Sequence, residues 1–324
     1  MLRQIYAPHL GRHVIIGGRR RPAPGPRLYL ADYLRRSALP SPPATCDYSK
    51  AAMAVLVDIY LNDQLGDCVI AGAYHSPVGT ATGNAGDLFH ATPEQIIADY
   101  SAIGGYVPGD PNTDNGCDEV TAMNYWKSHG FANGTKIAGW LNLDPLSKTE
   151  IMQALYLFEN VYFGIELPDA WIDPMPSADN FVWGVAGNPD PDNGHCVSGV
   201  AYDSKGVIID TWGLLGWITW AAIAEYCTAA NGGELHVMLT PDSIIKAQEK
   251  APNGLNWSQL ITDFDAMGGN VPVPTPPPPT PTPPVVTGYT ISATADATGK
   301  ITSGTVKVIT SKAELQNPTF QTVS

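Results

Sequence analysis

The first half of the chain combines apolar residues at helical spacing with polar residues that start helices. Asp67 precedes an apolar run at residues 68–74, which predicts an N-capped helix with Cys68 in its first turn. Thr92 and Pro93 stand in the order favoured for a cap and a first helical residue. The pattern predicts four helices in this half, over residues 68–74, 92–100, 118–129 and 147–159.

The second half changes to short runs rich in β-branched and aromatic residues. Such runs predict strands over residues 161–167, 195–202, 207–210 and 234–239. The sequence Asp-Ser-Lys-Gly at residues 203–206 predicts a hairpin turn, and residues 217–228 predict a further helix. A helical half followed by an antiparallel sheet half indicates an α+β fold with a cleft between its two layers.

Composition divides the chain into parts. Residues 1–45 are rich in Arg, Pro and Gly and predict a basic extended arm, with a short helix or strand within residues 28–39. The body spans residues 46–271. Residues 272–284 form a proline-rich linker, and polyproline II geometry of roughly 3.1 Å per residue predicts a stiff spacer about 40 Å long.

The last part, residues 285–324, alternates apolar and polar positions around Gly299 and Gly304, which predicts two or three strands. A segment of about forty residues without cysteines rarely folds alone. We therefore expect this small β-rich tail to anchor the chain by completing its core against a structural partner protein or another copy of itself.

Charge is distributed unevenly along the chain. The formal net charge of −13 combines +7 in residues 1–36, which hold eight Arg and one acid, with −20 in the remainder. A basic arm ahead of an acidic body docks on that body, stays solvated, or binds an acidic partner or nucleic acid. The triplet Arg19-Arg20-Arg21 is too short and irregular to specify nucleic-acid binding, so an intramolecular or solvated arm is favoured.

The cysteine pattern argues against metal and disulfide chemistry. The five cysteines are scattered without paired metal-binding spacing: Cys46, Cys68, Cys117, Cys196 and Cys227. We expect neither a zinc site nor a disulfide framework, and no cofactor. We also expect no export signal, because the N-terminus lacks a charged and then apolar pattern with a small-residue cleavage site. No membrane partner is expected, because the most apolar later stretch, residues 212–224, is short and interrupted by Gly.

Two acidic loops are candidate cation sites, but ordinary turns explain both. Residues 110–116 partly match a calcium loop, but Asn115 takes the place of its Gly and Thr121 the place of its Glu. A turn-rich loop near the cleft is therefore favoured. Residues 188–193 are likewise expected to form an acidic turn.

Three residues far apart in the sequence have the order that a cysteine nucleophile requires. Cys68 opens a predicted helix, where the helix N-terminus lowers a thiol pKa. His195 begins one predicted strand and Asp210 ends the next, so the hairpin brings both to one end of the sheet. There we expect Asp210 to accept the Nδ1 proton of His195 and to direct the ring toward Cys68. Each residue alone has a structural explanation, and only the combination indicates catalysis.

Neighbouring residues supply the other parts of such a site. An amide of Asn62 or Gln64 is expected to join the Cys68 backbone N–H in an oxyanion hole. Trp212 is expected to shield the site from water in the cleft. His75, two turns along the helix of Cys68, is predicted to point away from the thiol.

These motifs resemble those of the papain-like cysteine peptidase superfamily. Leu-Gly-Asp-Cys68 resembles its nucleophile segment, especially the calpain-type form. Gly-His195 resembles the start of its base strand, and the Asp-Thr-Trp-Gly beginning at Asp210 resembles its Asn-Ser-Trp-Gly. The resemblance covers roughly residues 46–240 and implies a papain-like two-layer body. The chain departs from the superfamily at Asn62, where Gln is usual, and at Val69, where an aromatic is usual.

The chain is also similar to uncharacterised papain-like proteins of tailed bacteriophages. Two functions from different classes follow. One is a cysteine hydrolase, a peptidase or amidase, acting on a peptide or protein such as a host surface or cell-wall peptide. The other is a catalytically inactive structural protein, such as a virion head or tail decoration or fibre. The linker and tail favour attachment to a larger assembly, such as a virion, under both.

Overall fold

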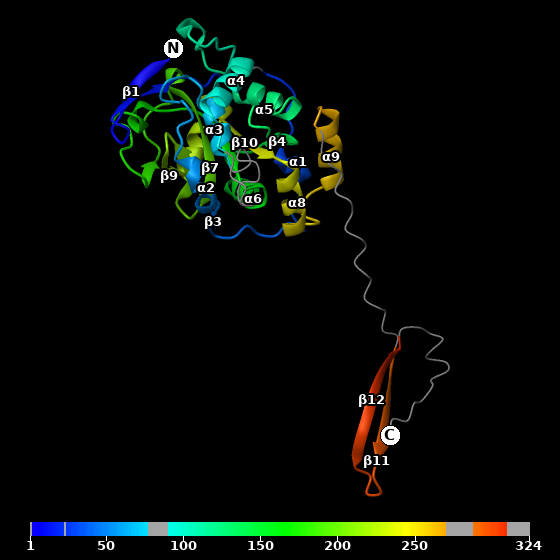
Figure 1. The fold of residues 1–324 in the computed structure, drawn as a ribbon. Helices are drawn as coiled ribbons and strands as arrows, with labels where there is room; N and C mark the ends of the chain where they lie inside the picture. Colours follow the sequence, from blue (N-terminus) through cyan, green and yellow to red (C-terminus); the bar gives the residue numbers. More distant parts are fainter. Residues whose placement is uncertain (1, 23, 77–89, 270–287, 310–324) are drawn as a thin grey trace. The chain divides into compact units, whose positions relative to one another are not determined.

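The computed structural model describes residues 2–22, 24–76, 90–269 and 288–309 (Figure 1). The chain folds as two compact units, Met1–Pro272 and Val273–Ser324. The predicted proline-rich linker, residues 272–284, lies outside the described residues.

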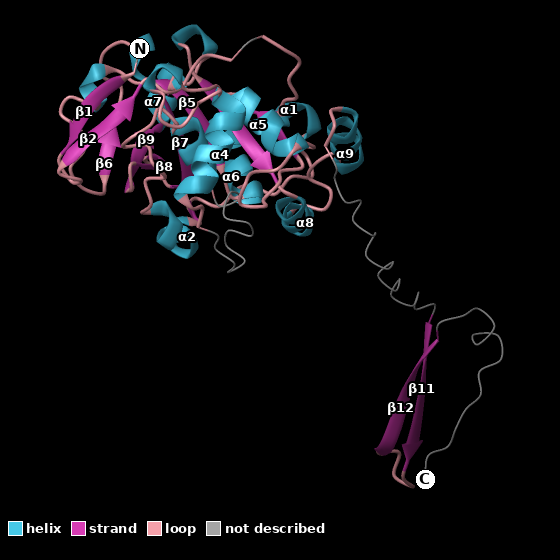
Figure 2. Cartoon of the chain, turned by 45° about the horizontal axis from the view of Figure 1, so that its top comes forward, coloured by secondary structure: helices cyan, strands magenta, loops and turns pink. Residues whose placement is uncertain are grey.

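An eight-stranded sheet runs through the first unit (Figure 2). Its strands follow the order β4-β10-β5-β7-β8-β9-β6, with β3 paired to β7, and all neighbours are antiparallel except β6 and β9. The strands are β3 (Cys46–Asp47), β4 (Gly139–Asn142), β5 (Val161–Glu166), β6 (Phe181–Trp183), β7 (Gly194–Tyr202), β8 (Gly206–Thr211), β9 (Leu214–Thr219) and β10 (Glu234–Leu239). The four strands predicted for this half are present as β5, β7, β8 and β10, and the α+β class is confirmed.

Helices pack against this sheet in two large cores, and α2 packs on Val200 of β7 in a small third cluster. One core contains Cys196 of β7 and side chains of α3, α4 and α5. The other contains Val197 of β7 and side chains of α6, α7 and α8. Because successive residues of a strand point to opposite faces, β7 contributes to both cores. The helices are α1 (Leu30–Tyr33), α2 (Ser49–Leu56), α3 (Cys68–His75), α4 (Pro93–Gly104), α5 (Glu119–Ser128), α6 (Lys148–Phe158), α7 (Trp220–Tyr226), α8 (Pro241–Lys250) and α9 (Trp257–Ala266).

Side-chain caps explain where three of these helices begin. Thr92 accepts a hydrogen bond from the Gln95 backbone N–H, and the Gln95 side chain accepts one from the Thr92 backbone N–H, which completes a capping box. Asp118 and Ser147 cap α5 and α6 in the same position. These helices begin where the sequence predicts, and α4 continues to Gly104.

The helix predicted over residues 217–228 is wrong in its first part. β9 (Leu214–Thr219) pairs with β8, and α7 begins only at Trp220, after the Thr219 cap. Trp212 and Gly213 both have positive φ, 47° and 76°, and the chain reverses there along β8. Apolar periodicity does not distinguish a short buried strand from a buried helix. Hydrogen bonding to β8 makes Leu214–Thr219 a strand, which the local pattern does not reveal.

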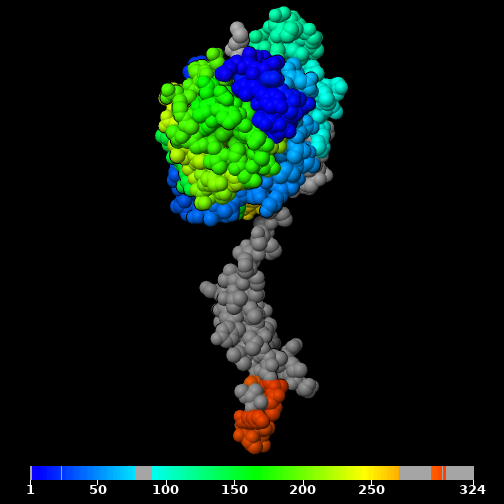
Figure 3. Space-filling model, turned by 90° about the vertical axis from the view of Figure 1, so that its left-hand side faces the viewer, coloured from blue at the N-terminus to red at the C-terminus, as the bar shows by residue number. Residues whose placement is uncertain are grey.

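The N-terminal arm is folded onto the body (Figure 3, blue). β1 (Arg3–Ala7) and β2 (Arg12–Ile16) form an antiparallel hairpin that the sequence analysis does not predict, and α1 follows within residues 28–39. Val14, Ile16 and Leu30 are buried in the same core as Val197. Hydrophobic burial therefore holds the arm in place.

Ion pairs also hold the arm. Its arginines bind acids of the body in the pairs Arg12–Asp63, Arg19–Glu119, Arg19–Glu234, Arg21–Glu166 and Arg27–Glu234. Of the alternatives for the basic arm, intramolecular docking on the acidic body is the one found in the structure.

The second unit contains one described hairpin. β11 (Gly288–Ala295) pairs antiparallel with β12 (Ile301–Ile309), and the register shifts between Thr294 and Ala295. Side chains of residues 293–300 are exposed. In the part of the chain that the structure describes, no helix has the length and apolar character needed to cross a membrane.

Candidate active site

Cys68 lies in the first turn of α3 and has only 1% of its surface exposed. Its thiol contacts the main chain of Cys196 in β7 and shares a core with Cys117. Burial raises the pKa of the Cys68 thiol, and the charge of Asp67 raises it further. The expectation of a lowered thiol pKa is wrong for this conformation, because loss of hydration outweighs the effect of the helix N-terminus.

Asp67 occupies the N-cap position of α3 without capping it. Its side chain accepts no hydrogen bond from the helix, and its Oδ1 accepts one from Asn62 Nδ2 at 3.2 Å. Its Oδ2 is buried without a partner. Burial raises the pKa of Asp67 well above its usual range. The helix predicted here exists, but it begins without the predicted side-chain cap.

His195 is held by two neighbours from the end of β8 and the turn after it. Its Nε2 lies 2.9 Å from Thr211 Oγ1, and its ring stacks on Trp212 with centroids 4.1 Å apart. Its Nδ1 is buried without a hydrogen-bond partner. Burial lowers the pKa of His195 to about 3, with a further contribution from His75, so the ring is neutral at neutral pH.

Asp210 does not accept the Nδ1 proton of His195, and this part of the predicted triad is corrected. Asp210 Oδ2 lies 2.9 Å from Nδ1 of His75, whose Nε2 donates to the Asp58 carbonyl oxygen at 2.6 Å. His75 therefore ties the end of α3 to β8. Burial acts to lower the pKa of His75, but the charge and hydrogen bond of Asp210, together with the contacts to Asp58, outweigh this and raise it.

A β-bulge explains why Thr211 and not Asp210 lies on the His195 side of the sheet. Near the turn β7 and β8 pair regularly, but the register shifts around Val200, so that Ser198 pairs with Asp210. Strand side chains alternate between faces, so a shift of one residue exchanges them. Without the bulge, the hairpin register would place Asp210 on the face of His195.

The two amides expected in the oxyanion hole have different surroundings. Asn62 is buried, and its Nδ2 donates to the Leu65 carbonyl oxygen and to Asp67 Oδ1, both at 3.2 Å. Gln64 is exposed. Among the described residues, no hydrogen bond joins Asn62, Gln64 or His195 to the Cys68 sulfur. The Cys68 backbone N–H lies in the first turn of α3, where N–H groups have no partner within the helix.

The arm crosses this site as an extended segment. The N–H groups of Gly17 and Arg19 both donate to the Gly194 carbonyl oxygen, directly before the candidate histidine, at 3.2 Å. Opposite, the Cys117 N–H donates to the Gly18 carbonyl oxygen at 3.0 Å, and the Cys117 carbonyl oxygen accepts from the Arg20 N–H at 2.9 Å. Residues 17–20 are therefore bonded to the chain on both sides and cover the site.

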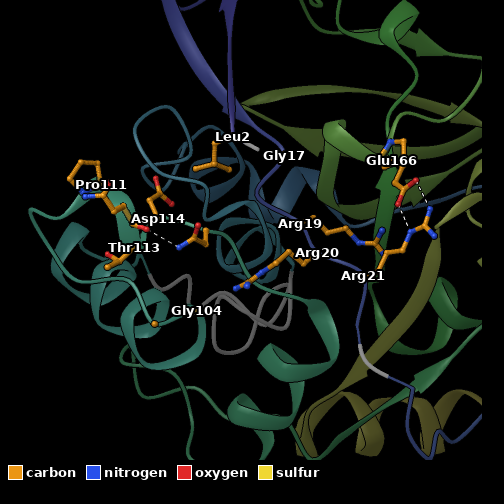
Figure 4. Close-up of a pocket in the computed structure, with 14 residues that line it drawn as sticks. Leu2, Gly17, Arg19, Arg20, Arg21, Gly104, Pro111, Thr113, Asp114 and Glu166 are labelled. Atoms are coloured by element: carbon orange, nitrogen blue, oxygen red, sulfur yellow. Dashed lines mark hydrogen bonds and ion pairs between the residues drawn. The ribbon is translucent and has the colours of Figure 1, made fainter.

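A cavity of about 880 Å³ lies beside the arm (Figure 4). Arg20 and Arg21 lie between Asp114 on one wall and Glu166 on the other, and Glu166 binds Arg21 through both carboxylate oxygens. Asp114 belongs to the loop examined for calcium binding. It accepts hydrogen bonds from the Gly66 N–H at 3.0 Å and the Tyr100 hydroxyl at 2.5 Å, so it fixes the loop before Cys68.

No group of three metal-ligating side chains occurs in residues 2–22, 24–76, 90–269 and 288–309. The turn at residues 188–193 is held by protein contacts. Asn193 Nδ2 donates to the Leu167 carbonyl oxygen at 3.1 Å and to Asp169 Oδ1 at 2.9 Å.

The sequence analysis missed several residues of the site. Thr211 stands in the Asp-Thr-Trp-Gly motif, but its role depends on the bulge. Arg19 is distinguished in the sequence only as part of the positive charge of the arm. Glu119 and Glu234, which bind it, gave no signal of pairing because each lies more than ninety positions away along the chain.

Comparisons with known proteins bear on the fold. No protein-family model matches the sequence, and no curated protein matches it. Among solved structures, the chain is similar to xylellain, a cysteine protease from Xylella fastidiosa, with a TM-score of 0.50 and 13% identity over 69% of this chain and 96% of that one. It also matches the cysteine protease and lectin-like domains of Cwp84, a surface layer associated protein of Clostridium difficile, with a TM-score of 0.48 and 10% identity, covering 69% of this chain and 55% of that one. The first of these similarities shows that the chain has the papain-like fold that the sequence predicts.

Proposed function

We propose that this chain is a papain-like cysteine hydrolase of peptide or amide bonds, with Cys68 as nucleophile and His195 as acid and base. One observation carries the proposal. The Cys68 thiol packs against the main chain of Cys196, directly after His195, and His195 has one buried ring nitrogen, Nδ1, without a partner. The calpain-type segment before Cys68 supports the same assignment.

In this mechanism Thr211 takes the orienting role that the sequence assigns to Asp210. Thr211 accepts the Nε2 proton of His195, which leaves Nδ1 as the basic nitrogen. His195 is on the β7 face of Val197, whereas Cys68 packs on the face of Cys196, so opening of the site must bring Nδ1 to the sulfur. Nδ1 then takes the proton of the Cys68 thiol, and the sulfur attacks the carbonyl carbon. The imidazolium then protonates the leaving amine, and water hydrolyses the resulting thioester. The Cys68 backbone N–H stabilises the oxyanion.

The described conformation is the closed form of this enzyme. Cys68 and His195 are both buried under the arm, and burial opposes the charged state of each. We propose that residues 17–20 move away before a substrate binds. Hydration of the site then restores the reactivity of the thiol.

A glycine substitution in the arm tests the proposal. A Cβ at Gly18 would lie 2.2 Å from the Gly66 carbonyl oxygen, whereas a Cβ at Gly25 meets nothing within 4 Å. We expect Gly18→Ala to loosen the arm, to increase the rate of Cys68 alkylation by iodoacetamide by on the order of tenfold or more, and to reveal hydrolysis of a fluorogenic peptide library. Gly25→Ala is the matched control and should behave as wild type, in which the partly exposed Cys46 reacts first.

Adding His195→Ala to the Gly18→Ala chain should slow Cys68 alkylation by on the order of tenfold or more. The proposal fails if Cys68 in the loosened chain reacts no faster than the buried Cys227 and its rate does not depend on His195.

A structural protein without activity is the second candidate. The raised pKa of Cys68, caused by burial, and the engagement of Asp210 with His75 favour it. The same alkylation experiment separates the two functions, because an inactive protein has no reason to keep an imidazole-dependent thiol.

We also propose that the tail, residues 285–324, tethers the body to a larger assembly, a bacteriophage virion. An isolated two-stranded hairpin is marginally stable, so β11 and β12 require further strands from a structural partner or from copies of this chain. In that setting the substrate is a host surface or cell-wall peptide. Deletion of residues 285–324 should release the body from purified particles, and retention of the truncated chain would argue against the tether.

A further inference from the structure

The arm lies in the site in the manner of a bound peptide. An extended peptide in a groove forms main-chain hydrogen bonds with the walls, and its side chains enter pockets. Residues 17–20 make four such bonds, two to the Gly194 carbonyl oxygen and two to Cys117. Arg19 pairs with Cys117 as in a parallel sheet.

The main chain approaches so closely that side chains are excluded at defined positions. A Cβ on Gly18 would lie 2.2 Å from the Gly66 carbonyl oxygen. The segments on both sides of the arm also have glycine where they contact it. A Cβ on Gly116 would lie 1.9 Å from the Gly18 carbonyl oxygen, and one on Gly194 would lie 2.2 Å from the Arg19 carbonyl oxygen. The groove therefore admits an extended peptide only with glycine at the position of Gly18.

The next residue, Arg19, fills a pocket that matches a guanidinium group. Its side chain is 1% exposed, with Nε 2.8 Å from Glu119 Oε1 and Nη2 2.7 Å from Glu234 Oε1. Nη1 donates to the Gly232 carbonyl oxygen. Three nitrogens thus meet three acceptors in different directions, which the single ammonium of lysine does not reproduce.

The pocket itself carries the charge for such a ligand. Glu119 Oε2 is fully buried and has no partner, so the pocket retains an acceptor beyond those that Arg19 uses. A Cβ at Gly164 would lie 1.5 Å from Glu119 Oε1, so the glycine in β5 makes room for this carboxylate. Arg27 still pairs with Glu234 when Arg19 leaves, but the fully buried Glu119 pairs with Arg19. A buried carboxylate that loses its cation is costly, which favours a cationic occupant of the groove.

We propose, resting on the function proposed above, that the groove binds peptides with the sequence Gly-Arg, and that Gly18 and Arg19 are the built-in copy of this ligand. Glu119 and Glu234 then determine specificity for arginine. A substrate reaches the groove by replacing residues 17–20, and its arginine takes over both carboxylates. Peptides with an acidic or small residue in place of the arginine leave the buried Glu119 without this cation, although Arg27 still pairs with Glu234, and they are rejected.

The test uses the full chain with Gly18→Ala and Arg19→Ala, which loosens the arm and empties the pocket. A fluorescein-labelled peptide copying residues 14–22 is titrated and its anisotropy measured. We expect it to bind about tenfold or more tightly than peptides with alanine in the place of Arg19 or of Gly18. The wild-type chain should bind none of them, because its groove is filled. Equal affinity for the three peptides would overturn the proposal.

Arg19→Lys provides a second variant if circular dichroism shows that the first does not fold. It keeps a cation in the pocket but loses the three-way match. The peptide with arginine should slow Cys68 alkylation in this variant at least about fivefold more than the peptide with alanine. No difference between the peptides would contradict the proposal.

The outcome is separable from that of the hydrolase proposal. Selective binding of the arginine peptide without its cleavage supports the groove and argues against hydrolysis. Cleavage of library peptides without preference for Gly-Arg supports hydrolysis and argues against this specificity.

Discussion

At the scale of residues, His195 is defined by what holds each of its ring atoms. Thr211 lies at Nε2, Trp212 lies against the ring face, and Nδ1 is left without a partner. A buried nitrogen without a hydrogen-bond partner costs free energy, so its presence asks for a functional explanation. The neutral ring is the form that accepts a proton, and burial is the main reason that it stays neutral.

The lowered pKa of His195 predicts a specific loss of stability in acid. The unfolded chain binds a proton near pH 6.5 and the folded chain only near pH 3, so the contribution is present above pH 6.5 and is lost as the pH falls toward 3. Between pH 7.5 and 5.0 the wild type should lose about 2 kcal/mol more of its unfolding free energy than His195→Gln. Denaturant unfolding of both proteins at the two pH values measures this, and parallel losses would show that His195 is already solvated.

At the scale of elements, the bulge at Val200 and the pair His75–Asp210 fix α3 against the sheet. The Tyr48 N–H donates to the Val200 carbonyl oxygen at 3.0 Å, and Val200 packs with side chains of α2, so the bulge is held from outside the hairpin. The resulting register turns Asp210 toward α3, where His75 binds it. The same helix carries Cys68 at its other end.

Replacing one partner of the His75–Asp210 pair should lower the free energy of unfolding more than replacing both. His75→Leu leaves Asp210 buried without its partner, and we expect a loss of about 3–5 kcal/mol in unfolding free energy. His75→Leu with Asp210→Leu should recover most of it, because no buried charge remains. Chemical denaturation of the wild type, the single variant and the double variant measures the three unfolding free energies. A double variant as unstable as the single one would show that packing, not charge, accounts for the loss.

At the scale of the whole molecule, the chain consists of a folded body that includes its own arm and a separate tail unit. The arm contributes buried side chains and the buried Arg19 to the body, so it is part of the folded domain as well as the cover of the site. The tail unit contains a hairpin whose residues 293–300 are exposed.

Removal of residues 273–324 should therefore leave the body unchanged. We expect the melting temperature of the truncated chain to match that of the full chain within about 2 °C, because residues 273–324 belong to a compact unit of their own and a loss of 1 kcal/mol would lower it by roughly 2–4 °C. Scanning calorimetry of both chains provides the comparison. A clear fall in the first transition would mean that the tail stabilises the body.

Local sequence signals determined much of this protein. Caps at Thr92, Asp118 and Ser147 placed three helices, and short runs rich in β-branched and aromatic residues placed β5, β7, β8 and β10, because these signals act between residues close in the chain. The motif around Cys68 placed the thiol at a helix start for the same reason.

Only the tertiary structure decided the chemistry around Cys68. Whether Asp210 or Thr211 faces His195 depends on one extra residue in β7, which the α2 region holds in place. Whether the Cys68 pKa is lowered or raised depends on its burial in a core shared with β7, α4 and α5, whose residues are distant in the chain. A shift of register by one residue exchanges the faces to which the side chains of a strand point, and the pKa of a thiol depends on its hydration. Contacts between distant parts of the chain set both, so no local sequence pattern contains them.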